Sequence, residues 1–315
     1  MQIVCTSPSF AQYSDAPIAA LHAQGIELVR LPADIDEAQF IARAAGACGA
    51  IVAFNAVSEQ VLAALPRLRV VAKHGVGVDN IDLMAAARHG VTVANVPAAN
   101  RHAVADFTFA LLLSLARAIP HIDATTRQGQ WPRHFGHDVH GTTLGIVGLG
   151  SIGKAVARRA AGFEMTVMAH DPFADPAKAH ELGVTLVELD VLCQQSDFLT
   201  LHVGLNDQTH HLIDARRLML MKPGAMLINA ARGGLVDENA LFKALSQRRL
   251  AGAALDAFEE EPVRHHPIFT LDNVIATSHV AGYTENALTT LSMSCVHDVM
   301  AVLSNQTPTH PVRSA

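Results

Sequence analysis

Positive charge, cysteine and long apolar runs are all scarce in this chain of 315 residues. Charged residues make up 17% of the sequence, the formal net charge is -6, and lysine and arginine form no run. Because nucleic-acid-binding proteins need a basic surface, we expect no nucleic-acid partner. The longest apolar stretch, residues 107–116, is about half as long as a bilayer-spanning helix. We therefore interpret it as a buried helix and expect no membrane association.

Paired cysteines and a leader peptide are lacking as well. Four cysteines are spread along the chain without paired spacing: Cys5, Cys48, Cys193 and Cys295. This scatter predicts reduced thiols rather than a disulfide framework or a zinc site. The first six residues have neither the basic start nor the apolar segment of a signal peptide, so we expect a cytoplasmic protein. His134, His137 and His140 are close in sequence but have no helical period, so we expect no metal site there.

Short apolar runs rich in β-branched residues alternate with amphipathic stretches along the whole chain. This alternation is typical of parallel sheets with crossover helices. A first series of strands is expected at 3–5, 27–29, 49–52, 70–72 and 91–93. A second series is expected at 143–147, 165–169, 198–201, 225–229, 252–255 and 274–277. The sequence therefore predicts an α/β fold with two parallel-sheet domains of Rossmann-like or flavodoxin-like type.

Two helical segments indicate how these domains connect. A long apolar helix is expected over 100–118, and a segment rich in glycine, proline and histidine follows over 129–141. A domain boundary is plausible there. The last helix, expected over 285–303, comes after the second sheet is complete, so we expect it to cross back and pack on the first domain.

A glycine-rich turn directly follows the strand expected at 143–147. Gly148 permits a tight turn, Gly150 lets the backbone approach a pyrophosphate, and Gly153 lets the next helix pack close to the sheet. The following strand ends at Asp171, where an acid is expected to bind the ribose 2′-hydroxyl of a dinucleotide. A carboxylate there repels a 2′-phosphate, so NAD is predicted over NADP. The alternative is an ordinary glycine-rich turn.

Three chemically active side chains follow three successive strands. Arg232, Glu261 and His279 should meet at one crevice, because ligands bind beyond the carboxyl ends of parallel strands. Reducing a ketone needs a cation for the substrate carboxylate, a proton donor and a group that keeps the donor protonated. Arginine, histidine and glutamate meet these needs. Taken singly, Arg232 could cap a helix, Glu261 could belong to a solvated acidic run, and His279 could be a core histidine.

With these motifs the sequence resembles the D-isomer-specific 2-hydroxyacid dehydrogenase family over nearly its whole length. The matching segments are 148–153, 230–233, 261–262, 279–282 and a loop at 73–82. The resemblance implies a catalytic set of Arg232, Glu261 and His279. It implies NAD contacts at Val76, Gly148, Gly150, Ser151, Ile152, Gly153, Asp171, Val203, Ala230, Asp256 and Gly282. It implies substrate contacts at Gly75, Val76, Gly77, Arg232 and His279.

The same resemblance implies a domain organisation. A split substrate domain, 1–98 plus 286–315, would close over an inserted NAD-binding domain, 99–285. A homodimer is also implied, in which residues 107–115 would face a partner or, alternatively, belong to the core of their own chain. Ser278 and Gly204 stand where the family usually has proline, which affects backbone rigidity rather than reacting groups.

The predicted function is NAD-dependent interconversion of a small 2-keto acid and its D-2-hydroxy acid, with glyoxylate or hydroxypyruvate as the preferred type of substrate. Phosphoglycerate-specific relatives tend to carry an arginine after the third strand, where residues 52–56 hold no cation. Formate dehydrogenases of this architecture lack the glutamate, so Glu261 opposes that alternative. An NADH-responsive corepressor remains an alternative of another class, opposed by the short stretch that follows the last helix.

Overall fold

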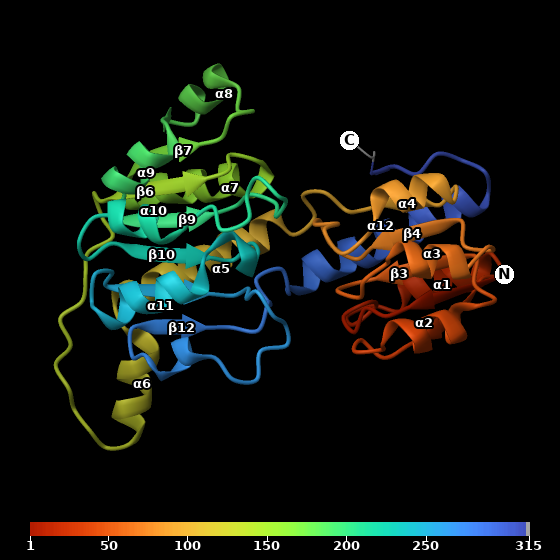
Figure 1. Ribbon diagram of the computed structural model, residues 1–315, viewed down its shortest axis with the longest axis horizontal. Coiled ribbons are helices and arrows are strands. Elements are labelled where there is room, and N and C mark those ends of the chain that lie inside the picture. Colours follow the sequence, from red (N-terminus) through yellow and green to blue (C-terminus); the bar gives the residue numbers. More distant parts are fainter. Residues whose placement is uncertain (313–315) are drawn as a thin grey trace. The chain divides into compact units, whose positions relative to one another are not determined.

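The computed structural model describes residues 1–312, which form two compact units. The first unit contains Met1–Asn100 together with the chain from Tyr283 onward, and the second contains Arg101–Gly282. Each unit is built around its own parallel sheet with helices on both faces (Figure 1). The two-domain α/β fold predicted from the sequence is therefore confirmed.

The sheet of the first unit has the strand order β2-β1-β3-β4-β5. Its strands are β1 Gln2–Cys5, β2 Glu27–Arg30, β3 Gly49–Val52, β4 Val70–Lys73 and β5 Thr92–Ala94. Its helices are α1 Ala16–Ala23, α2 Glu37–Ala44, α3 Glu59–Ala64, α4 Leu83–Arg88 and α12 Glu285–Leu303. Asp36, Ser58 and Asp82 cap α2, α3 and α4, each accepting a backbone N–H from the first turn.

Helix α12 joins the first unit as expected, because it packs against β3, β4, β5 and α1. Its Val296 and Val299 are fully buried in a cluster that also holds Ile3, Ile51 and Val70 of the sheet. Burying apolar side chains of this size contributes about 1.5–3 kcal/mol each. The carboxyl-terminal helix thus belongs to the core of the first unit.

The sheet of the second unit has the order β12-β11-β10-β9-β6-β7-β8. Its strands are β6 Thr143–Val147, β7 Thr166–His170, β8 Val184–Leu186, β9 Phe198–Leu201, β10 Met226–Asn229, β11 Gly252–Leu255 and β12 Val274–Ala276. Its α-helices are α5 Arg101–Ala116, α6 Ile119–Arg127, α7 Ser151–Ala160, α8 Pro176–Glu181, α9 Leu189–Gln195, α10 Ala215–Leu220 and α11 Glu238–Ser246. Single 3₁₀ turns are η1 Ala161–Phe163, η2 Gly233–Leu235 and η3 Pro267–Thr270.

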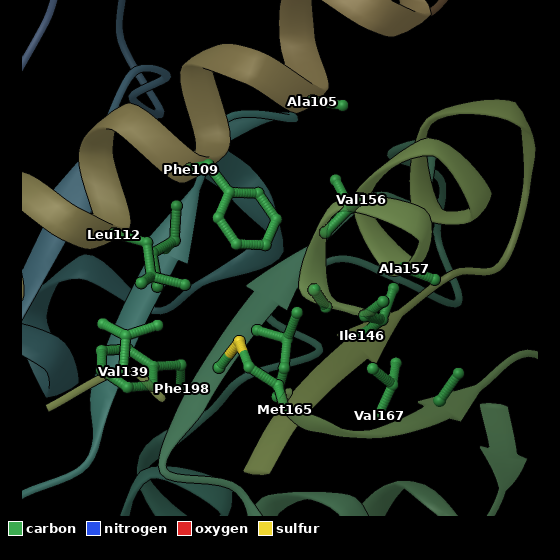
Figure 2. Close-up of a cluster of buried hydrophobic side chains, with 14 of the residues drawn as sticks. Ala105, Phe109, Leu112, Val139, Ile146, Val156, Ala157, Met165, Val167 and Phe198 are labelled. Atoms are coloured by element: carbon green, nitrogen blue, oxygen red, sulfur yellow. The ribbon is translucent and has the colours of Figure 1, made fainter. Parts of the chain in front are cut away.

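Helix α5 lies in the core of the second unit and packs against α7. Figure 2 shows Phe109 and Leu112 of α5 in the cluster that also holds Val156 of α7 and Ile146 of β6. The Phe109 ring stacks on Phe163, with ring centroids 5.3 Å apart. The apolar stretch within this helix therefore contributes to the core of its own chain.

The structure corrects two details of the sequence prediction. The helix expected over 100–118 ends at Ala116, and Ala118, with φ 50°, separates it from α6. Strand β8 was not predicted, because it has three residues at the sheet edge and only Val184 is buried. The cysteines are free as expected, and Cys48 is only half-buried while the other three are buried.

Within residues 1–312, no single helix is both long and apolar enough to cross a membrane. Helices α5 and α6 meet that criterion only when taken together, and they are bent by 62° at the break between them.

Candidate active site

The residues predicted to carry the chemistry follow three neighbouring strands. Arg232 comes after β10, Glu261 after β11 and His279 after β12, and these strands lie side by side at one edge of the second sheet. Because all three strands are parallel, their carboxyl ends open on the same side. The second unit therefore brings these three loops together.

His279 and Glu261 form a direct pair. The imidazole Nδ1 of His279 lies 2.8 Å from Glu261 Oε2, and both side chains are mostly covered, with 23% and 29% of their surface exposed. The backbone N–H of Phe258 donates to Glu261 Oε1 at 2.9 Å. Partial burial acts to raise the pKa of Glu261, but the hydrogen bond and charge of His279 outweigh it, so this pKa lies below its usual value. The pair is therefore a carboxylate that faces one ring nitrogen of a histidine.

Asp256 holds the loop that carries His279. This buried carboxylate accepts the Thr277 hydroxyl at 2.6 Å and the N–H groups of Val280 and Ala281 at 3.0 and 2.9 Å. These bonds surround His279, whose φ of 56° is uncommon for a residue other than glycine. The family resemblance implied only a cofactor contact for Asp256. Its position at the end of a buried strand was the signal that it must have partners in the fold.

Asn229 holds the loop that carries Arg232. Its side-chain amide donates to the carbonyl oxygen of Arg232 at 2.8 Å and accepts the N–H of Ala231 at 3.1 Å. A Cβ on Gly233 would lie 1.8 Å from the carbonyl carbon of Phe258, so only glycine allows the two loops to pack this closely. The positive charge of Arg232 also contributes to the lowered pKa of Glu261. Sequence reasoning did not identify Asn229.

The glycine turn after β6 has the shape that a pyrophosphate needs. Gly148 has φ +93°, and a Cβ there would lie 2.6 Å from Val203 Cγ1. A Cβ on Gly153 would lie 2.1 Å from the Gly148 carbonyl oxygen, whereas one on Gly150 would meet nothing within 4 Å. Space is therefore open in front of Gly150 at the first turn of α7, where the backbone N–H groups attract an anion. The turn fits the diphosphate of a dinucleotide.

Asp171 lies beside this turn at the end of β7. Its Oδ2 accepts the N–H of Leu149 at 2.8 Å and its Oδ1 accepts the N–H of Phe173 at 2.9 Å. These bonds fix the half-buried carboxylate next to the glycine turn, and each oxygen keeps a further lone pair. A ribose hydroxyl could donate to it there. Ser151 and Ile152 begin α7, while Ala230 and Gly282 lie on the loops after β10 and β12.

The predicted substrate loop belongs to the first unit. Gly75, Val76 and Gly77 are half-buried residues that follow β4. The side-chain amide of Asn95 donates to the Val76 carbonyl at 2.6 Å, and the N–H of Val96 donates to the Gly75 carbonyl at 2.9 Å. The two residues that follow β5 therefore fix the course of this loop.

Two buried side chains, Lys73 and His74, begin the predicted loop 73–82 and lie directly before Gly75. His74 bonds Ser7 through Nδ1 at 2.9 Å and Ser292 through Nε2 at 3.0 Å, and burial lowers its pKa to about 4. The ammonium group of Lys73 donates to the Ala53 carbonyl and, at 2.6 Å, to Asn80. Lys73 thus places a cation beside residues 52–56, a segment that contains no cation of its own. The sequence signal was its position at the end of the strand that pairs with β3.

Comparisons with known proteins extend this description. Residues 109–281 match the family model described as D-isomer specific 2-hydroxyacid dehydrogenase, NAD binding domain. The chain is 44% identical over 234 residues to a D-3-phosphoglycerate dehydrogenase of Methanocaldococcus jannaschii, a match covering 73% of this chain but only 45% of that protein. It is 40% identical over 261 residues to a glyoxylate reductase of Thermococcus litoralis, covering 80% of this chain and 79% of the relative. A D-lactate dehydrogenase of Aquifex aeolicus, solved with NAD and lactic acid, superposes over 100% of both chains with a TM-score of 0.87 and 28% identity.

The glycine turn and the NAD-binding family model identify an NAD-dependent oxidoreductase. The model match covers more than half of the chain, and the glyoxylate reductase match covers most of both proteins. The chain belongs to the D-isomer specific 2-hydroxyacid dehydrogenase family.

Proposed function

We propose that the protein uses NADH to reduce a small, unphosphorylated 2-keto acid of the glyoxylate or hydroxypyruvate type to the D-2-hydroxy acid. The observation that carries the proposal is the contact of 2.8 Å between His279 Nδ1 and Glu261, on a loop packed against that of Arg232. A histidine held at one nitrogen by a carboxylate presents its other nitrogen as a proton donor. A 2-keto acid offers the oxygen that takes this proton and the carboxylate that a guanidinium binds.

Each reacting group has one task in this proposal. NAD supplies or accepts the hydride when it is bound. His279 gives the proton from Nε2 to the substrate carbonyl oxygen during reduction, and Glu261 stabilises the charged imidazolium before that transfer. Arg232 binds the substrate carboxylate, and the backbone N–H groups of Val76 and Gly77 would also donate to it.

The remaining site residues bind the cofactor. Gly148, Gly150, Ser151, Ile152 and Gly153 would surround the diphosphate, and Asp171 would accept the ribose hydroxyls. The residues proposed around the nicotinamide and its ribose are Val76, Val203, Ala230, Asp256 and Gly282. Gly75 would let the loop approach the substrate. The open space at Gly150 supports this assignment.

The domain roles belong to the same proposal. Residues 1–98 plus 286–315 would form the substrate domain, and residues 99–285 the inserted NAD-binding domain. The division of the structure after residues 100 and 282 supports these limits. We propose a cytoplasmic homodimer, and the exposed apolar side chains Trp131 and Phe135 of the second unit, 87% and 90% exposed, favour a partner.

The buried environment of Lys73 favours a substrate without a phosphate group. Lys73 is 6% exposed, and its ammonium group already donates to the Ala53 carbonyl oxygen and to the Asn80 side chain. A phosphate would therefore compete with acceptors of the protein itself. The similarity to a phosphoglycerate dehydrogenase keeps 3-phosphoglycerate as the second candidate substrate.

Turnover with a substrate panel tests the proposal. We expect NADH to be oxidised with glyoxylate and hydroxypyruvate, and much more slowly with the phosphorylated analogue of hydroxypyruvate. His279→Ala should lower kcat by roughly two to four orders of magnitude. Replacing the exposed His180 with Ala is the matched control and should leave kcat unchanged. Absence of turnover with every 2-keto acid, while NADH still binds, would favour the corepressor alternative.

A further inference from the structure

A second group of titratable side chains lies outside the proposed catalytic set. It comprises His210 and His211, on the segment between β9 and α10, and Glu259, on the loop after β11. Their ligand atoms all lie within 4.8 Å of one another, and within residues 1–312 they form the one such group of three. The two imidazole rings stack, with centroids 3.9 Å apart and an interplanar angle of 23°. The group is accessible, since His211 and Glu259 have 36% and 35% of their side-chain surface exposed.

A hydrogen bond from the backbone N–H anchors each of these three residues. The N–H of His211 donates to the Gly234 carbonyl at 2.7 Å, and that of His210 donates to the Asn206 carbonyl at 2.9 Å. The N–H of Glu259 donates to Glu238 at 2.9 Å. Three ligands whose backbones are anchored in this way are preorganised, so less ordering is needed when an ion binds.

The donor set matches a particular class of cation. Two imidazoles and one carboxylate suit Zn²⁺, which takes three protein ligands and leaves a fourth position to water in open sites. Tetrahedral ligands around Zn²⁺ lie about 3.3 Å apart, and the ligand atoms of these three residues all lie within 4.8 Å of one another, so they must move closer together to hold the ion. Calcium and magnesium prefer all-oxygen sites, so they do not fit. Within the described residues the His210 ring makes no side-chain hydrogen bond, whereas His211 Nε2 lies 2.5 Å from Glu259 Oε1.

We propose that His210, His211 and Glu259 form a binding site for one zinc-class divalent cation. The bound ion ties the segment after β9, which carries Val203, to the loop after β11, which carries Glu261. The ion therefore stabilises the positions of these two segments relative to each other, and it takes no part in proton or hydride transfer.

Zinc titration of the full chain without a histidine tag tests this site. Isothermal titration with Zn²⁺ alone should give one ion per wild-type chain and a higher midpoint of thermal unfolding. His210→Ala and Glu259→Gln should each weaken binding at least about tenfold, since even changes to residues behind a ligand cost that much. Both residues are exposed, so circular dichroism should show unchanged folding.

His265→Ala provides the matched control. His265 is exposed and also stands in a consecutive histidine pair, whose second member, His266, lies 3.0 Å from Glu238. This variant should bind Zn²⁺ as the wild type does. The proposal is overturned if the wild type binds no ion, or if His210→Ala and Glu259→Gln bind it as tightly as His265→Ala. Zinc binding that disappears only in His279→Ala would also overturn it, because the ion would then occupy the catalytic pair.

Discussion

Adding one methyl group at Gly233 should disrupt the active site while leaving the cofactor turn intact. A Cβ there would lie 1.8 Å from the carbonyl carbon of Phe258 and 2.2 Å from the nitrogen of Glu259. Ordinary contacts begin near 3.4 Å, so the two backbones would have to separate by about 1.6 Å. No side-chain rotation relieves this clash, because the atoms on both sides belong to the backbone.

The displacement sets the size of the effect. Overpacking of this kind costs about 1–3 kcal/mol of stability. A misplacement of about 1 Å between reacting groups can cost roughly 100-fold in rate. Since Gly233→Ala moves Arg232 away from Glu261 and His279, we expect kcat/KM for 2-keto acid reduction to fall about 100-fold. NADH affinity should fall much less than kcat/KM, because the turn at 148–153, which would hold the diphosphate, is untouched.

Steady-state reduction and a fluorescence titration with NADH measure the two quantities. Gly162→Ala is the control, because a Cβ at Gly162 would meet nothing within 4 Å. It should leave both quantities unchanged. A Gly233→Ala enzyme with wild-type kcat/KM would refute the close packing of the two loops as a requirement for activity.

Three further predictions concern individual carboxylates and a buried histidine. Asp171→Ala should weaken NADH use and narrow the preference over NADPH, and equal kcat/KM values for both cofactors in the wild type would oppose this role. Asp256→Asn should lower kcat about tenfold or more, because the loop around His279 loses hydrogen bonds. An unchanged kcat would show that Asp256 does not position His279. For His74, burial lowers the pKa to about 4, so the unfolded chain binds the proton first as pH falls from about 6.5. The contribution of His74 to the free energy of unfolding should thus be complete above about pH 6.5. It should decline by up to roughly 3 kcal/mol as the pH falls toward 4. The midpoint of thermal unfolding should fall less steeply over this range in His74→Asn, and identical slopes would contradict the assignment.

Strand ends were the most predictable part of this protein. Arg232, Glu261 and His279 could be placed on one edge because parallel strands direct all their following loops to the same side. The side chains that hold these loops were harder to foresee. Asn229 and Asp256 act through backbone N–H and carbonyl groups, whose positions depend on how the loops fold back.

Strand β8 and the contact of Lys73 with Ala53 could not be predicted, for a different reason. Strand β8 buries only Val184, so its sequence has too little apolar signal to distinguish it from a loop. Lys73 was assigned to the loop that follows the predicted strand 70–72, and its contact with Ala53 arises only when β4 pairs with β3. Sequence periodicity predicts which residues are buried, but it does not give the partners that neighbouring strands provide.

The pair of His279 and Glu261 is the centre of the proposed chemistry, and its charge can be removed without changing its shape. Because the pKa of Glu261 lies below its usual value, the carboxylate stays charged across the neutral range and is protonated only as pH falls through this lowered pKa. Glu261→Gln removes the charge that stabilises the imidazolium. Glu260→Gln, at the exposed neighbouring position, is the matched control.

The most direct test is the pH profile of kcat/KM for 2-keto acid reduction in the wild type and these two variants. The alkaline limb of the profile should move to lower pH in Glu261→Gln, because the proton donor loses its charged partner, and it should stay in place in Glu260→Gln. Coincident profiles for all three proteins would show that Glu261 takes no part in the proton transfer, and would contradict the proposed site.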